Sequence, residues 1–215
     1  MRLLLFVGFL GAGKTTLILS VARQATEAGL RLCVIVNEIG EVGIDGKVLR
    51  LGELEVREIT AGCICCQIGV DLVRTLHELE EQFRPELVII EASGIATPEG
   101  VLESLQYYPA KNVTGIETIT IVDPTRFEAL HTVLTPLIEA QILGADRVVV
   151  TKQDQATALD LQETSQALRR LVPDIPVFVV DATESETLAD FLAALPAAPA
   201  ATGADIKVDA GATAF

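Results

Sequence analysis

The stretch G-F-L-G-A-G-K-T-T, residues 8–16, constrains the fold of this chain more than any other feature. It directly follows the apolar run Leu3–Val7, which predicts a buried strand, and it opens the helical pattern Thr16–Glu27. Its spacing fits G-x-x-x-x-G-K-[ST] in the strand–loop–helix context that a phosphate-binding loop requires. The glycines let successive backbone N–H groups converge on phosphate oxygens, and the helix N-terminus adds its positive end. We therefore predict a nucleotide-binding loop here.

The side chains of this loop have separate expected roles. Lys14 can bridge the β- and γ-phosphates, and the Thr15 hydroxyl is placed to bind Mg²⁺. The residues of the loop that we expect to bind the nucleotide are Gly11, Ala12, Gly13, Lys14, Thr15 and Thr16.

Short apolar runs alternate with helical patterns along the rest of the chain. The runs that predict strands are Leu3–Val7, Leu32–Val36, Leu54–Ile59, Leu87–Ile90, Thr118–Val122, Arg147–Val150 and Val177–Val180. The segments with apolar residues spaced three and four apart include Thr16–Glu27, Val70–Phe83, Thr135–Leu143 and Ala158–Leu171. Continuous apolar strands separated by helices favour a parallel sheet that is covered on both faces. We predict an α/β fold with a doubly wound, mostly parallel sheet and helices on both faces.

Chain length and composition predict one domain. The chain has 215 residues, of which 50% are hydrophobic, and this is enough for a single well-buried core. After Leu195 the sequence becomes P-A-A-P-A-A-T-G-A-D, which offers few side chains to bury. We expect a domain over residues 1–195 and a flexible Ala/Pro-rich tail over residues 196–215.

Charge and hydropathy exclude several classes of partner. The formal net charge of −14 disfavours binding to nucleic acid and to anionic membranes, because both carry negative charge. No apolar stretch is long enough to span a bilayer, and the N-terminal run lacks the pattern of a secretory signal. We therefore expect a cytoplasmic protein.

A second polar motif, E-A-S-G, follows the predicted strand Leu87–Ile90. In doubly wound sheets, ligands bind beyond the carboxyl ends of the strands. Glu91 could hold the Mg²⁺ shell there, and the Gly94 N–H could contact the γ-phosphate. An isolated glutamate at a strand end more often has a structural role. The phosphate-binding loop in the same chain favours a functional role for this one. We expect Lys14, Glu91 and Gly94 to be catalytic and Thr15 and Glu91 to bind magnesium.

A third motif, T-K-Q-D, follows the predicted strand Arg147–Val150. The carboxylate of Asp154 can accept hydrogen bonds from both N1–H and the N2 amino group of guanine, a donor pair that adenine lacks. The stem of Lys152 can cover the face of the purine. Both residues are expected to bind the nucleotide, with guanine preferred.

Three of the four cysteines, Cys63, Cys65 and Cys66, lie in the stretch G-C-I-C-C-Q. Cysteines this close make strained disulfides, and in a reducing cytoplasm a cysteine cluster is more often a metal site or a catalytic site than a structural feature. The cluster falls between a predicted strand and a predicted helix. A position near a helix N-terminus lowers the pKa of a thiol and favours the thiolate.

Soft sulfur ligands select Zn²⁺, Co²⁺ or Cu⁺ over Mg²⁺, and Zn²⁺ or Co²⁺ is our leading expectation. Three thiols leave a fourth coordination position open, which Glu38 or Glu41 could fill. Cys33, in L-C-V-I-V, is expected in the core, and His77 and His131 are expected to be structural rather than metal ligands.

The motifs in this order resemble the GTPase domain of the CobW family of metallochaperone-like proteins, which is related more distantly to HypB and UreG. The matching stretches are the phosphate-binding loop, N-E-I-G-E-V-G-I-D, G-C-I-C-C, E-A-S-G, I-V-D-P and A-D-R-V-V-V-T-K-Q-D. The resemblance implies GTP hydrolysis, Mg²⁺, a transition metal at the three cysteines and a client metalloprotein or cofactor-assembly protein as partner. Thr151 replaces the usual Asn, and the chain ends where family members usually continue into a C-terminal domain.

Three functional hypotheses follow. The first is a GTPase switch that couples nucleotide state to the binding and delivery of a transition metal, with a nucleotide-dependent homodimer among its expected states. The second is an ATP-dependent protein that holds a metal or an iron–sulfur cluster. The third is a nucleotide-regulated thiol module that senses redox state. In the first, the segment Asn37–Asp45 is the one that γ-phosphate and Mg²⁺ would order.

Overall fold

The computed structural model describes residues 1–38, 48–51, 54–60, 67–181 and 185–195. The described strands are β1 (Arg2–Val7), β2 (Leu32–Glu38), β3 (Val48–Leu51), β4 (Leu54–Thr60), β5 (Leu87–Glu91), β6 (Gly115–Val122), β7 (Arg147–Val150) and β8 (Val177–Val179). The described helices are α1 (Lys14–Glu27), α2 (Gln67–Phe83), α3 (Pro98–Leu105), α4 (Pro124–Val133), α5 (Thr135–Leu143), α6 (Ala158–Leu171) and α7 (Ser185–Ala194), with a short 3-10 helix at Ala110–Asn112.

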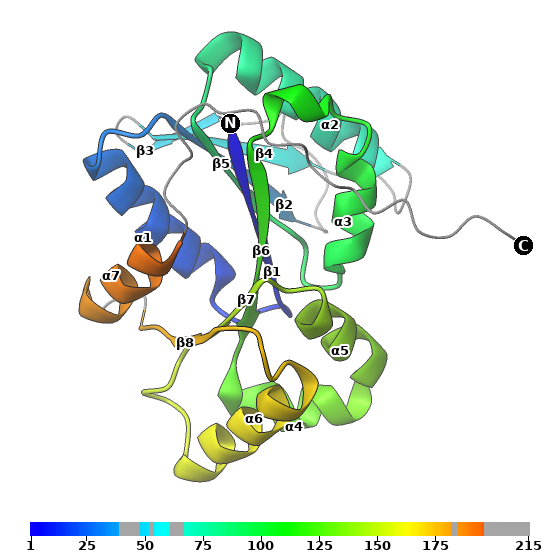
Figure 1. Ribbon diagram of the computed structural model, residues 1–215, viewed down its shortest axis with the longest axis vertical. Helices are drawn as coiled ribbons and strands as arrows, with labels where there is room; N and C mark the ends of the chain where they lie inside the picture. The colour runs from blue at the N-terminus through cyan, green and yellow to red at the C-terminus, as the bar shows by residue number, and fades with distance from the viewer. Residues whose placement is uncertain (39–47, 52–53, 61–66, 182–184, 196–215) are drawn as a thin grey trace, which may run out of the picture.

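All of these strands belong to one sheet, in the order β3-β4-β2-β5-β1-β6-β7-β8 (Figure 1). Neighbouring strands are parallel except for β3, which runs antiparallel to β4 at the edge. The first strand lies inside the sheet, where β5 and β6 flank it. The chain thus places β2 to β4 on one side of β1, returns to insert β5 between β2 and β1, and then adds β6, β7 and β8 on the other side. The predicted doubly wound α/β fold is confirmed.

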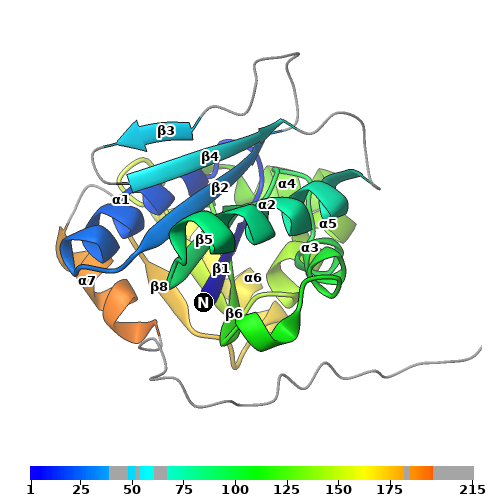
Figure 2. The ribbon, with the colours of Figure 1, turned by 90° about the horizontal axis from the view of Figure 1, so that it is seen from above.

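Alternate residues of β1 face two different helical layers. Leu4 and Phe6 pack with α1 and α7, whereas Leu3 and Leu5 pack with α2 and α3. Figure 2 shows these two pairs of helices on opposite sides of the sheet. Because both faces are covered, the strand is apolar at every position from Leu3 to Val7, which explains its continuous hydrophobic run.

The seven predicted strands are all present, and most differ from the prediction by one or two residues at an end. The structure adds β3, and it adds the helices α3, α4 and α7 to those named from the sequence. Two of the added helices carry start signals. The Thr97 side chain accepts from the Gly100 N–H before Pro98, and the Asp123 side chain accepts from the Thr125 N–H before Pro124.

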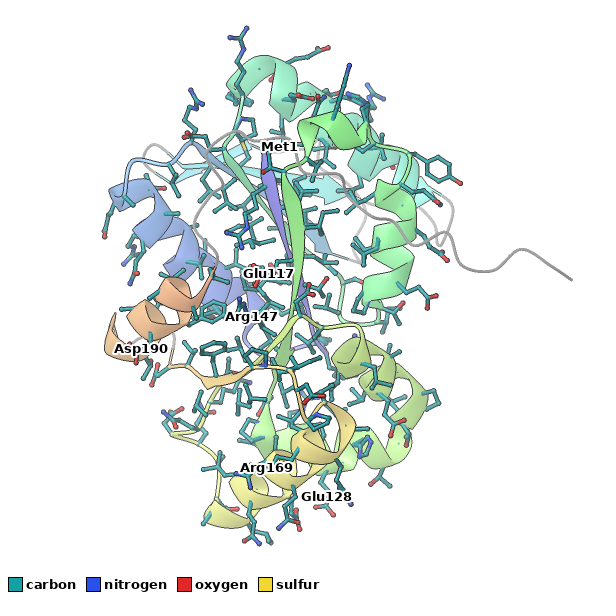
Figure 3. The ribbon with its side chains drawn as sticks, viewed as in Figure 1. Met1, Glu117, Glu128, Arg147, Arg169 and Asp190 are labelled. Atoms are coloured by element: carbon teal, nitrogen blue, oxygen red, sulfur yellow. The ribbon has the colours of Figure 1, made fainter. Side chains whose placement is uncertain are left out.

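A buried ion group lies at the amino ends of the central strands. The Glu117 carboxylate in β6 pairs with Arg2 in β1 and with Arg147 in β7. Glu117 and Arg147 lie next to each other near the centre of Figure 3. Since phosphate-binding loops follow the carboxyl ends of strands, this group is at the edge of the sheet opposite the loop and has a structural role.

Two further expectations concern the C-terminal tail and membrane-spanning helices. The predicted tail, residues 196–215, lies outside the described residues. Among the helices that the structure describes, none has the length and apolar character needed to cross a membrane.

Candidate nucleotide site

The loop after β1 presents the N-terminus of α1 to its cleft. Gly13 is the N-cap residue, and its left-handed φ of 94° favours glycine. Among the described residues, no side chain makes a capping bond at this helix start, and its first backbone N–H groups face the loop. Uncapped N–H groups at a helix start are suited to phosphate oxygens.

Lys14 is buried within the same loop, with 6% of its surface exposed. Its ammonium group donates to the carbonyl oxygens of Gly8 at 2.8 Å and Phe9 at 3.3 Å. Gly8 is required here because a Cβ on it would lie 2.4 Å from the Ile121 carbonyl oxygen. The loop therefore curls around a positive charge.

Thr15 and Glu91 meet beside the loop. The Thr15 hydroxyl lies 2.8 Å and 3.1 Å from the two carboxylate oxygens of Glu91, to which it donates. The pairing follows from strand register, since Phe6 in β1 is opposite Glu91 at the end of β5. A hydroxyl and a carboxylate are hard oxygen donors of the kind that Mg²⁺ prefers, so these residues fit the predicted ion.

The turn that follows β5 lies against the phosphate-binding loop. A Cβ on Gly94 would be 2.7 Å from the backbone nitrogen of Leu10, so only glycine allows this approach. The two segments enclose a cleft of about 680 Å³. The residues that line it are Leu10, Gly11, Gly13, Lys14, Thr15, Thr16, Val36, Glu91, Ala92, Ser93, Gly94, Ile95 and Lys152.

The structure thus brings most of the predicted nucleotide and magnesium residues to one cleft. Ala12 is buried in the wall of the loop. Asp154 lies on the exposed turn after β7, and it is not among the described residues that line the cleft.

Thr151 ties this turn to the phosphate-binding loop. Its hydroxyl donates to the carbonyl oxygen of Ala12 at 2.7 Å, and the residue is only 5% exposed. Thr151 therefore bonds directly to the phosphate-binding loop.

Lys152 makes contacts that the sequence did not indicate. It has a left-handed φ of 51°, and its ammonium donates to the Gly11 carbonyl at 2.5 Å and to Asp123 at 2.9 Å. Asp123, which is 5% exposed, also caps α4. Arg126 of that helix donates to the Leu10 carbonyl at 3.0 Å. The motif I-V-D-P is the signal that could have placed Asp123 here.

Most of the predicted transition-metal ligands fall outside the described residues. Cys63, Cys65, Cys66 and Glu41 lie outside the described residues, and of Glu38 only the backbone, at the end of β2, is described. Within the part of the chain that is described, no cluster of three or more His, Cys, Asp or Glu side chains could hold a metal.

The remaining cysteine and the histidines have structural surroundings. Cys33 is 2% exposed in the core, as predicted. The His77 ring lies 4.7 Å from the ring of Tyr108. His131 stacks on Phe127 and lies 3.1 Å from a Glu139 oxygen.

A doubly wound sheet whose first strand leads through a phosphate-binding loop into a helix defines the P-loop NTPase fold. Residues 2–179 match the family described as CobW/HypB/UreG, nucleotide-binding domain. The chain belongs to this family.

Individual relatives agree with this assignment. A protein of a Sinorhizobium species named zinc chaperone CobW is 30% identical, over 87% of this chain and 60% of the relative. Zinc chaperone YeiR of Escherichia coli is 34% identical, over 77% of this chain and 49% of the relative. The crystal structure of Zn(II)-bound YjiA GTPase from Escherichia coli has a TM-score of 0.61 and 26% identity, over 84% of this chain and 57% of that one. In each case this chain spans less than two thirds of the relative.

Proposed function

We propose that this protein binds GTP in the cleft beside α1, hydrolyses it, and couples its nucleotide state to the binding and delivery of a transition metal. The observation that carries the nucleotide part is the pairing of Thr15 with Glu91 next to the buried Lys14. Family membership and relatives named zinc chaperones support the metal part. They favour this hypothesis over the ATP-dependent carrier and the redox module.

The residues of the cleft have distinct tasks in this proposal. Lys14 and the N–H groups at the start of α1 bind the phosphates and stabilise charge that develops on them. Thr15 and Glu91 hold Mg²⁺, which supplies further charge neutralisation when bound. The Gly94 N–H contacts the γ-phosphate, and Lys152 and Asp154 bind the guanine base.

The guanine preference can be tested by competition. GTP should displace a fluorescent GDP analogue far better than ATP does, and Asp154→Asn should reduce that preference because the amide offers one acceptor and one donor in place of two acceptors. Gln153→Asn, at the neighbouring position of the same turn, is the control. Equal affinity of the wild-type protein for ATP and GTP would refute guanine recognition.

The metal part of the proposal assigns Zn²⁺ or Co²⁺ to Cys63, Cys65 and Cys66, with Glu38 or Glu41 as a fourth ligand in the GTP state. Hydrolysis would release that fourth ligand. Thermodynamic linkage then requires that bound metal raises the affinity for GTP relative to GDP. The factor must equal the one by which GTP, relative to GDP, raises the affinity for metal, and it is typically about 5–150-fold.

A metal titration under reducing conditions tests this coupling. Co²⁺ is added in the presence of GDP or of a non-hydrolysable GTP analogue, and binding is followed by the thiolate-to-cobalt absorption. The triple Cys63→Ser, Cys65→Ser, Cys66→Ser variant should lose the signal, whereas Cys33→Ala should keep it. Equal cobalt affinities in both nucleotide states would refute the coupling, even with metal bound.

We further propose a cytoplasmic location, a client metalloprotein or cofactor-assembly protein as partner, and a nucleotide-dependent homodimer. Leu10 and Ile95, which are 68% and 63% exposed, form an apolar margin on the cleft and support a partner surface there. Sedimentation with GDP and with the GTP analogue measures the homodimer. A single domain over residues 1–195 followed by a flexible tail remains our expectation.

A further inference from the structure

The turn that carries Gly94 is held from the side opposite the phosphate-binding loop. It is closed by a hydrogen bond from the Ala96 N–H to the Ser93 carbonyl at 3.0 Å. On one side, Gly94 lies against the backbone of Leu10. On the other side lies Gln141 of α5.

Gln141 makes two bonds to this turn. Its side-chain amide nitrogen donates to the Ala96 carbonyl at 2.8 Å and to the Gly94 carbonyl at 3.2 Å. These bonds use both hydrogens of the amide group. Gln141 is only 2% exposed, so water does not compete for these donors. A buried polar side chain that satisfies two loop carbonyls fixes the peptide groups between them, here including the one that carries the Ala96 N–H. That N–H donates to the Ser93 carbonyl, which belongs to the same peptide group as the Gly94 N–H, so the constraint reaches the Gly94 N–H through the turn.

Gln141 is itself anchored to the sheet. The Thr120 hydroxyl in β6 donates to the Gln141 backbone carbonyl at 2.5 Å, and Thr120 is 1% exposed. At the end of α5, a Cβ on Gly144 would lie 2.8 Å from two carbons of Pro98. The C-terminal end of α5 therefore contacts the turn through Gln141 and the start of α3 through its C-cap residue Gly144. Helices α3 and α5 are neighbours in Figure 1.

We infer that Gln141 is a positioning residue that holds the Gly94 N–H in the orientation that recognises the γ-phosphate. The inference rests on the proposed function of Gly94. It gives Gln141 no contact with the nucleotide. Its loss should therefore weaken the response to the γ-phosphate while leaving the binding of GDP, which lacks that phosphate, unchanged.

The test compares the Gln141→Met variant with the wild-type protein. Methionine has a similar length and volume but no amide, so the turn loses both donors with little change in packing. The dissociation constants for GDP and for a non-hydrolysable GTP analogue are measured by calorimetry with Mg²⁺. We expect GDP affinity to change by less than about twofold and affinity for the analogue to fall about fivefold, the loss of about one hydrogen bond. The kcat for GTP should fall with it.

Ile142→Val is the matched control. Ile142 is the next residue of α5, 1% exposed in the core, and this change costs stability without touching the turn. It should leave the ratio of the two affinities as in the wild-type protein. An unchanged ratio in Gln141→Met, or the same change in Ile142→Val, would overturn the inference.

A second measurement uses the wild-type protein, so it does not depend on a variant that folds. The side-chain amide resonances of Gln141 should shift when the GTP analogue replaces GDP, and identical resonances in both states would overturn the inference. Absence of any GTP binding by the wild-type protein is a different result, because it would refute the proposed function and the inference together.

Discussion

Replacing Thr151 with valine tests the link between the turn after β7 and the phosphate-binding loop. The change keeps the branched shape but puts a methyl group where the hydroxyl donates to Ala12 at 2.7 Å. The Ala12 carbonyl loses a donor at a site where both residues are at least 95% buried. A lost buried hydrogen bond costs about 1 kcal/mol, and leaving a buried acceptor without its partner raises the total to about 1–3 kcal/mol.

Denaturation in urea should show this loss in the free energy of unfolding. A loss of about 2 kcal/mol corresponds to a fall in melting temperature of about 4–8 °C for a chain of this size. Because Ala12 belongs to the loop that we propose binds the β-phosphate, affinities for GDP and GTP should fall together. Thr151→Ser, which retains the hydroxyl, should keep the affinities of the wild-type protein. A Thr151→Val variant with unchanged stability and affinity would show that the hydrogen bond does not matter.

Three other substitutions have expected outcomes. Lys14→Ala should lower kcat for GTP by about 100-fold or more, because it removes the charge that stabilises the transition state, and undiminished turnover would refute the phosphate-binding assignment. Glu117→Ala should cost about 3–5 kcal/mol of unfolding free energy, since the buried Arg2 and the partly buried Arg147 lose their partner. A loss below about 1 kcal/mol in urea would contradict this. Burial and the adjacent Glu80 carboxylate raise the pKa of Tyr108 above its ordinary value. Tyr108→Phe should therefore be less stable at neutral pH by about 1–3 kcal/mol, the value of its bond to Glu80. This difference in unfolding free energy between the wild-type protein and the variant should narrow above about pH 10, because Tyr108 ionises at lower pH in the unfolded chain than in the folded protein. A difference that stays constant in urea melts from neutral pH to about pH 11 would contradict the raised pKa.

The sheet could be predicted from the sequence because its strands are buried on both faces. Runs such as Leu3–Val7 and Leu87–Ile90 are apolar at every position, and a strand of this kind has few alternatives. The strand Val48–Leu51 is different, since it is antiparallel at the edge and an arginine interrupts its apolar residues in V-L-R-L. It therefore lacks the continuous apolar run of a strand that is buried on both faces. The helix that begins at Pro98 carried a recognisable start, a threonine before a proline, that the apolar spacing did not reveal.

The site was predictable where a motif names the chemistry. Lys14, Thr15 and Glu91 meet in one cleft because Lys14 and Thr15 follow β1 and Glu91 ends the neighbouring parallel strand β5. Gln141 could not be found in this way. It lies in the last turn of α5 and reaches its partners only through tertiary packing, so nothing in its local sequence distinguishes it from a solvent-exposed glutamine.

The position of β1 inside the sheet has a consequence for synthesis on the ribosome. β1 is made early, yet both of its neighbours are made much later, since β5 begins at Leu87 and β6 at Gly115. At a synthesis rate of about 5–20 residues per second, β1 is made several seconds before the two strands that flank it. Glu91 reaches Thr15 only when β5 has docked. The nascent chain therefore gains a complete nucleotide cleft late, and until then the apolar side chains of β1 need contacts other than those with β5 and β6.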